Sequence, residues 1–222
     1  MVDFEQSAIK SLRACFPSAA VKTCYYHFMQ AFWRKINENS DIRARYVNEE
    51  NFNLMLKMLP ALAFLPSRDV VIGYIGLRSH TFFVHNETLL QPIFTYFERT
   101  YIGHINNGIV VSQPLFAIET WNVYDATINN MGRTNNSVEG WHNAFARFVG
   151  SNHPNIFNFL QKLKEYEALN RALITQISIG STTRQTRRKY RDLNLRIHTI
   201  AITYDPSNKV DYLKRISHNL NF

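Results

Sequence analysis

Apolar side chains recur every three or four residues along most of the chain, which is the spacing of an amphipathic helix. Helices are predicted over residues 3–15, 25–36, 51–59, 67–77, 89–101, 116–128 and 136–149, over a long segment after Ser151-Asn152-His153-Pro154, and on both sides of Asp205-Pro206-Ser207. Ser67 is a predicted N-cap, and Pro154 is predicted to lie in the first turn of its helix. The pattern therefore indicates a mostly α fold.

One short segment, residues 20–24, favours a strand, because turn residues flank it on both sides. Residues 106–114 are predicted to form a loop. A stable sheet usually needs about three strands, and Met1 and Val2 are too few to supply them. Two explanations stay open: either residues 20–24 are not a true strand, or the sequence lacks the sheet that would receive it.

The net charge and its distribution favour a polyanionic partner. The chain has 25 Lys and Arg against 17 Asp and Glu and a pI near 9.6. Nine basic and three acidic residues lie between Lys162 and Arg196. Such a clustered positive field fits nucleic acid or an anionic membrane, and a solvated helix face explains it equally well. The candidate nucleic-acid contacts are Arg184, Arg187, Arg188, Lys189 and Arg191.

Cysteine content and hydropathy bear on the compartment. Two cysteines, Cys15 and Cys24, make no disulfide framework and suit a reducing environment. The first residues include acids and no apolar targeting region, and the longest apolar run, 59–65, is bounded and broken by Pro60 and Pro66. We therefore expect an intracellular protein, nuclear or cytoplasmic, with no membrane partner.

Two acids are candidates for metal chemistry. Asp3 lies where a strand would end, and Glu139 lies in the first turn of a predicted helix. Carboxylates from separate elements can hold divalent cations such as Mg²⁺, and a pair of these ions can cleave phosphodiesters. The competing interpretation is structural, since Asp3 with Gln6 and Asn136 with Glu139 each match a helix capping box.

Four further residues are accessory candidates. Cys24 and His27 are three apart at the strand-to-helix turn, but no second pair completes a zinc site, so packing or hydrogen bonding of the turn is the better interpretation. His142 follows Glu139 by three residues and lies on nearly the same helix face, where it could assist the acid. Trp141 and the aromatic stripes fit a packed core better than base-stacking platforms.

Several segments resemble the Mutator-like (MULE) transposase domain, of the kind found with FLYWCH zinc fingers. They are VDFE at 2–5, CYYHFMQAFWRK at 24–35, FERTYIG at 97–103, WNVY at 121–124 and RTNNSVEGWH at 133–142. The resemblance implies a ribonuclease H-like DDE transposase that cuts and joins DNA with Mg²⁺ or Mn²⁺. It matches Asp3 to the second catalytic aspartate and Glu139 to the final glutamate, both as metal ligands.

The resemblance also implies a division of the chain. Residues 1–40 and 132–177 would belong to the catalytic core, 41–131 to a helical insertion, and 178–222 to a basic helical extension. The family's first aspartate lies on the opening strand, before the position of Asp3, and only Met1 and Val2 precede Asp3 here. We therefore expect an N-terminally truncated α+β remnant that lacks the first strands, binds no metal stably and has little or no activity.

Three alternatives to an inactive fragment stay open. The chain could be a repurposed nucleic-acid-binding or interaction module. It could be an enzyme completed by another chain that supplies the missing strands and acid. It could also be the product of a decayed element or of a partial gene.

Overall fold

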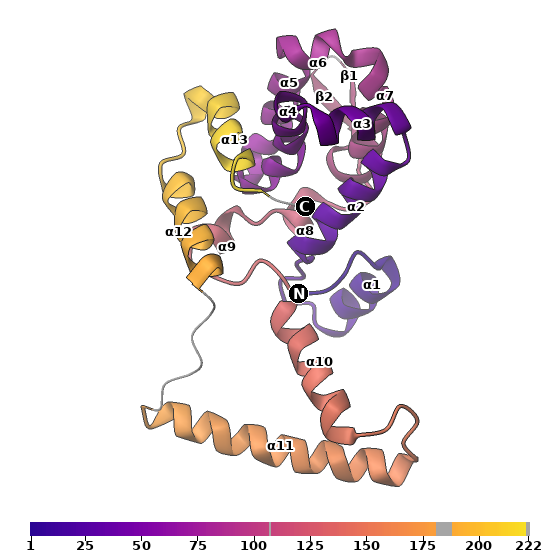
Figure 1. The fold of residues 1–222 in the computed structure, drawn as a ribbon, viewed down its shortest axis with the longest axis vertical. Coiled ribbons are helices and arrows are strands. Elements are labelled where there is room, and N and C mark those ends of the chain that lie inside the picture. The colour runs from indigo at the N-terminus through magenta and orange to yellow at the C-terminus, as the bar shows by residue number, and fades with distance from the viewer. Residues whose placement is uncertain (107, 181–187, 221–222) are drawn as a thin grey trace. The chain divides into compact units, whose positions relative to one another are not determined.

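The computed structural model describes residues 1–106, 108–180 and 188–220, and these residues are mostly helical (Figure 1). The elements up to the hairpin are α1 (Gln6–Cys15), α2 (Tyr25–Asn37), α3 (Ser40–Asn48), α4 (Glu50–Ala61), η1 (Leu62–Phe64), η2 (Ser67–Asp69), α5 (Val70–Arg78), α6 (Thr81–His85), α7 (Glu87–Phe97), η3 (Glu98–Ile102), β1 (His104–Asn106) and β2 (Ile109–Ser112). After it come α8 (Ile118–Trp121), α9 (Tyr124–Ile128), α10 (Asn136–Val149), α11 (Ile156–Ser178), α12 (Arg188–Ile202), η4 (Pro206–Asn208) and α13 (Lys209–Ser217). The predicted mostly α class is confirmed.

The chain divides into two compact units. Unit 1 comprises residues 1–134 and 192–222, and unit 2 comprises residues 135–191. The predicted division into a catalytic core, an insertion from 41 to 131 and a C-terminal extension stays a prediction.

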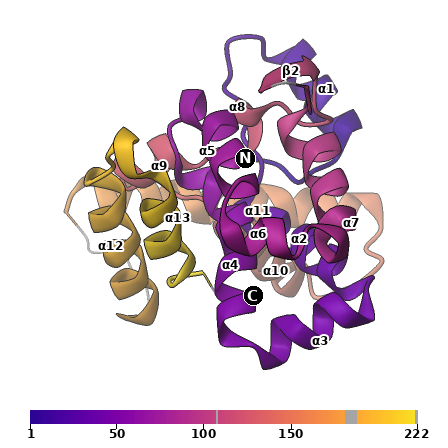
Figure 2. The same ribbon diagram turned by 90° about the horizontal axis from the view of Figure 1, so that it is seen from above.

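Unit 1 is built around an aromatic core. Phe28 of α2 is fully buried, stacks on Trp121 at 5.3 Å between ring centroids and meets the edge of Tyr101 at 4.7 Å. On the other side of this core, α13 packs against α4 and α5 (Figure 2), and the Tyr212 hydroxyl donates to the Phe64 carbonyl. Segments from both ends of the chain thus close one core.

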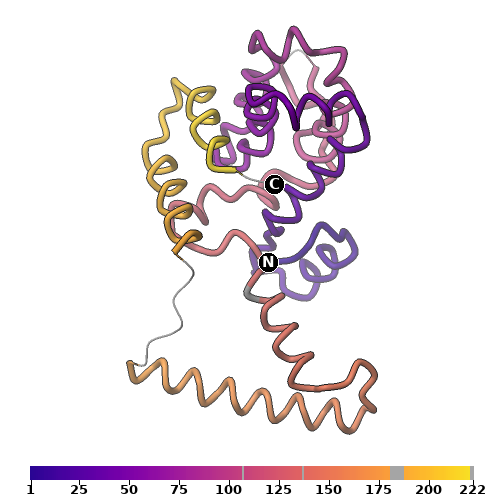
Figure 3. Tube along the Cα trace, viewed as in Figure 1, coloured from indigo at the N-terminus to yellow at the C-terminus, as the bar shows by residue number. Residues whose placement is uncertain are grey.

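Unit 2 is a helical hairpin. A loop after Gly150 joins α10 to α11, and Figure 3 shows the chain reversing there. Gly150 adopts φ +71°, the left-handed conformation that glycine tolerates at a helix C-terminus. Phe145 and Phe148 of α10 pack on Tyr166 of α11, with ring centroids 5.3 and 5.2 Å apart.

The predicted strand at residues 20–24 is wrong. Of these residues, Thr23 alone has a β partner, an isolated parallel bridge to Val2. The predicted loop at 106–114 is also wrong, because β2 pairs there with β1 as an antiparallel hairpin. Gly103, at φ +98° between η3 and β1, supplies a backbone conformation that other residues rarely adopt.

Several predicted helix starts need correction. The helix predicted from Ser67 begins at Val70, because Ser67 opens a separate 3-10 turn. The helix predicted over 3–15 starts at Gln6 with Glu5 as N-cap, so the capping box of Asp3 with Gln6 is wrong. In unit 2, Asn155 caps α11, and Pro154 therefore precedes that helix.

The single helix predicted over 116–128 is two short helices, α8 and α9. Asn122 lies between them and is buried, and its side-chain amide donates to the Leu65 carbonyl over 2.7 Å. The Val123 N–H donates to the Ala63 carbonyl over 2.8 Å. These bonds to η1 and its C-cap replace helical bonds. The spacing of apolar residues cannot predict them, because their acceptors lie in a distant segment.

Candidate functional site

The N-terminus of α2 joins three distant segments of unit 1. Successive backbone N–H groups of Thr23, Cys24 and Tyr25 donate to the carbonyl oxygens of Thr120, Val2 and Arg133, over 2.8, 2.9 and 2.9 Å. We call this arrangement the α2 junction. These bonds supply acceptors for the N–H groups of Thr23 and Cys24, which lie in the predicted strand at 20–24, and buried N–H groups need such partners.

Asp3 lies beside this junction. The Val2 N–H donates to the Lys22 carbonyl and the Val2 carbonyl accepts from Cys24, so the backbone before Asp3 is fixed on both sides. The Asp3 Oδ1 atom lies 2.8 Å from Nδ1 of His27, in the first turn of α2. The Asp3 side chain remains 55% exposed and that of His27 24% exposed. The structure therefore brings two predicted site residues together and leaves the carboxylate accessible.

Cys24 has a different environment from His27. It is fully buried and occupies the N-cap position of α2. Its backbone N–H is one of the three donors of the α2 junction. Cys24 thus lies in the packed interior of the turn, whereas His27 reaches the partly exposed side where Asp3 lies.

Arg133, the first residue of the RTNNSVEGWH segment, is anchored in unit 1. Its guanidinium lies over the Phe64 ring at 5.5 Å and donates to Asn194 over 2.5 Å. Burial lowers the pKa of this guanidinium below its ordinary value. Its carbonyl accepts from Tyr25 at the α2 junction. The start of the segment is therefore held near Asp3 and His27 by backbone bonding, a link that sequence spacing does not reveal.

From Asn135 onward, that segment belongs to unit 2. Glu139 lies in the first turn of α10, and Asn135 rather than Asn136 is the N-cap, so the capping box predicted from Asn136 is wrong. Because Asp3 and Glu139 belong to different units, their convergence on one metal stays a prediction.

Trp141 and His142 follow Glu139 on α10. The Trp141 ring stacks on Phe145 at 5.4 Å and meets His142 at 5.3 Å. It is nevertheless 40% exposed, so its assignment to a packed core is wrong. A two-helix hairpin covers one side of such a ring and leaves the other open.

The basic candidates divide by position. Arg188, Lys189 and Arg191 are exposed at the start of α12. Arg184 and Arg187 lie outside the described residues. Their contact with nucleic acid stays a prediction.

Across the described ranges 1–106, 108–180 and 188–220, no group of three or more His, Cys, Asp and Glu residues could hold a metal ion. The carboxylate and imidazole of Asp3 and His27 alone make an incomplete set for Mg²⁺ or Mn²⁺, which prefer octahedral oxygen ligands. The metal expected from the resemblance stays a prediction.

Comparison of the chain with protein-family models, curated proteins and solved structures gave no match. In the part of the chain that the structure describes, no helix combines the length and apolar character needed to cross a membrane.

Proposed function

We propose that this chain derives from a Mutator-like DDE transposase and carries two of its metal-binding acids, Asp3 and Glu139. The observation that carries the proposal is the α2 junction. It gathers the start of the VDFE segment, the Cys24-x-x-His27 pair and the start of the RTNNSVEGWH segment at one helix terminus. These are three of the segments that resemble the transposase domain.

The connection between Val2 and Thr23 also supports this origin. The two residues form a parallel bridge, and α1 lies between them in the sequence. Neighbouring parallel strands require a crossover connection, which is usually a helix. The bridge with its helix is thus the smallest version of the strand–helix–strand unit that a ribonuclease H-like sheet uses.

In this proposal the residues of the junction have distinct tasks. Asp3 presents a carboxylate at the end of the bridge, and His27 orients it through the 2.8 Å contact with Oδ1. Cys24, buried at the N-cap, maintains the packing of the turn. Arg133 holds the start of the segment that leads to Glu139.

A protein made of these 222 residues is expected to lack strand-transfer activity. The resemblance implies three carboxylates, and this sequence supplies matches for two of them. Robust nicking of DNA by the purified protein with Mg²⁺ or Mn²⁺, abolished by Glu139→Gln, would contradict this expectation.

The pairing of the two acids can be tested without activity. Added Mn²⁺ should broaden the amide NMR signals near Asp3 and near Glu139 in the same titration. Asp3→Asn or Glu139→Gln should then reduce broadening at both places, because each acid contributes to one shared site. Broadening confined to one acid would reject the shared site, and Glu87→Gln on α7 is a control for non-specific binding of the ion.

A second candidate is a nucleic-acid-binding module without catalysis. The exposed side chains of Arg188 and Lys189 favour it, together with the basic composition of the chain. DNA affinity should then fall steeply with salt, because each neutralised phosphate releases counterions. Arg188→Ala and Lys189→Ala should weaken binding while Asp3→Asn leaves it unchanged.

A further inference from the structure

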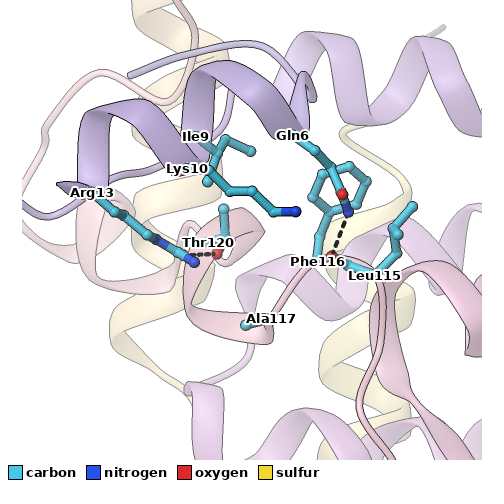
Figure 4. A pocket seen from close by; sticks show the side chains of 8 residues that line it. All are labelled: Gln6, Ile9, Lys10, Arg13, Leu115, Phe116, Ala117 and Thr120. Atoms are coloured by element: carbon cyan, nitrogen blue, oxygen red, sulfur yellow. Dashed lines mark hydrogen bonds between the residues drawn. The ribbon is translucent and has the colours of Figure 1, made fainter.

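A small pocket lies between α1 and the segment that leads into α8. Its cavity volume is about 80 Å³, and its apolar side includes Ile9 and Phe116. Figure 4 shows Gln6 and Lys10 extending from α1 over the pocket and Arg13 crossing to Thr120. Both walls belong to unit 1.

The polar groups of the pocket are mainly hydrogen-bond donors. Lys10 and Arg13 supply positive charge, Gln6 supplies an amide that donates to the Leu115 carbonyl over 3.3 Å, and Thr120 supplies a hydroxyl. None of the described residues that line the pocket carries a carboxylate. A pair of cations beside a small cavity favours an anionic ligand.

The arrangement of these donors suits a tetrahedral anion. The Arg13 guanidinium already donates to the Thr120 hydroxyl oxygen over 2.9 Å, which fixes its position and leaves further N–H groups of the fork available. Lys10 contributes a point charge from the same helix, three residues earlier. Donors from two elements beside one small cavity suit the separate oxygens of a phosphate, and charge-assisted bonds of this kind are the strong ones.

The pocket is bonded directly to the α2 junction. Thr120 carries the hydroxyl that Arg13 contacts, and its carbonyl accepts from the backbone N–H of Thr23 over 2.8 Å. Thr23 in turn forms the parallel bridge to Val2, next to Asp3. A ligand held in the pocket would therefore lie on the same bonded framework as the predicted catalytic acid.

We propose that this pocket binds a phosphate group through Lys10 and Arg13. The identification of that phosphate as part of a DNA backbone rests on the proposed function above, whereas the anion chemistry of the pocket does not. The alternative source is a free phosphate or phosphomonoester.

The nucleic-acid arm of the test uses the whole chain and a short fluorescent DNA duplex of random sequence. Lys10→Ala and Arg13→Ala should each weaken binding about tenfold and reduce the salt slope by about one. The matched control is Arg43→Ala, an exposed arginine on α3, which lies away from α1 in both ribbon views (Figures 1 and 2). It removes the same charge and should weaken binding less than about twofold.

The second arm uses inorganic phosphate alone. It should shift the amide NMR signals of α1 and of residues 115–120 in the unmodified protein and in Arg43→Ala, and leave them in place in Lys10→Ala. Lys10 is the decisive position because its side chain is exposed, whereas Arg13→Ala also removes the bond to Thr120. Folding of each variant is checked by circular dichroism.

The two arms of the test distinguish failure of the phosphate site from failure of the proposed function. If phosphate shifts the amide NMR signals and DNA does not bind, the pocket binds a free phosphate. That result would support the anion site and contradict a DNA partner. Equal DNA affinity in Lys10→Ala, Arg43→Ala and the unmodified protein, with no phosphate-induced shifts, would overturn the proposal.

Discussion

Both units have helices with regularly spaced apolar residues, but the two units differ in how far those residues are buried. In unit 1, side chains as large as Trp121, Tyr74 and Phe97 are less than 2% exposed. In the described part of unit 2, no side chain is fully buried, and Phe157 of α11 is 80% exposed. An apolar stripe therefore predicts a face that can be buried, and only the number of elements packed around it decides whether burial occurs.

The largest expected effect contrasts a buried with an exposed phenylalanine. Phe28→Ala in unit 1 should lower the free energy of unfolding by about 3–5 kcal/mol, because it empties a site enclosed by Trp121 and Tyr101. Phe157→Ala in unit 2 should change it by less than about 0.5 kcal/mol. Urea unfolding followed by circular dichroism measures both values.

The contrast between the units would fail if the two variants lost similar stability. Phe28→Leu serves as a control in the core, since it retains most of the buried apolar surface. A loss well below that of Phe28→Ala is expected for it.

Most helix positions could be predicted from spacing alone, because α2, α10, α12 and α13 each carry a regular apolar stripe. Two of the errors fall where a backbone or amide bond to a distant segment replaces a local one. Asn122 interrupts the predicted 116–128 helix because its amide binds Leu65, 57 residues away in the sequence. The parallel bridge of Thr23 likewise depends on a partner 21 positions earlier, Val2.

An intermediate effect is expected for the buried side-chain amide of Asn122. Asn122→Ala should cost about 1–3 kcal/mol of unfolding free energy, because it leaves the Leu65 carbonyl buried without its donor. The matched change in unit 2 is Asn170→Ala, whose amide donates to the Tyr166 carbonyl one turn earlier on α11. It should cost less than about 0.5 kcal/mol, since water can replace the bond. Comparable losses in urea unfolding would contradict this difference.

The candidate site shows the same division between local and distant information. Asp3, Cys24, His27 and Glu139 could be selected from the sequence, yet the contact between Asp3 and His27 could not. The 2.8 Å contact of Asp3 with His27 replaces the capping box that local spacing favours. Arg133 could be quoted as part of a motif, whereas its backbone bond to Tyr25 emerges only from the fold.

A smaller effect is expected from the Asp3–His27 contact. Asp3→Asn should lower stability by less than about 1 kcal/mol, because an exposed pair gains little in water. A double-mutant cycle with His27→Ala should give a coupling energy in the same range. Glu167→Gln in unit 2 removes the exposed pair with Arg171 and provides the matched control. Coupling of several kcal/mol at Asp3 would show that the contact stabilises the fold rather than presenting a carboxylate.

The smallest expected effect is a pH response of two surface pairs. Bonding to Arg45 lowers the pKa of Glu49 on unit 1, and bonding to Lys162 and Gln161 lowers the pKa of Glu165 on unit 2. A carboxyl with a lowered folded pKa contributes stability above its unfolded value, near 4.5, and loses it as the pH falls through the folded value.

The two units should respond differently in that pH range. Tertiary packing holds α3 in unit 1, where Ile42 and Tyr46 are buried, so its helical NMR chemical shifts should persist. No residue of α11 is buried, and its helix therefore depends more on local pairs. Fraying of α11 below pH 4.5 should accordingly exceed that of α3. In Glu165→Gln the part of this fraying that comes from the bond to Lys162 should vanish, and equal fraying of both helices would show that burial does not separate the units.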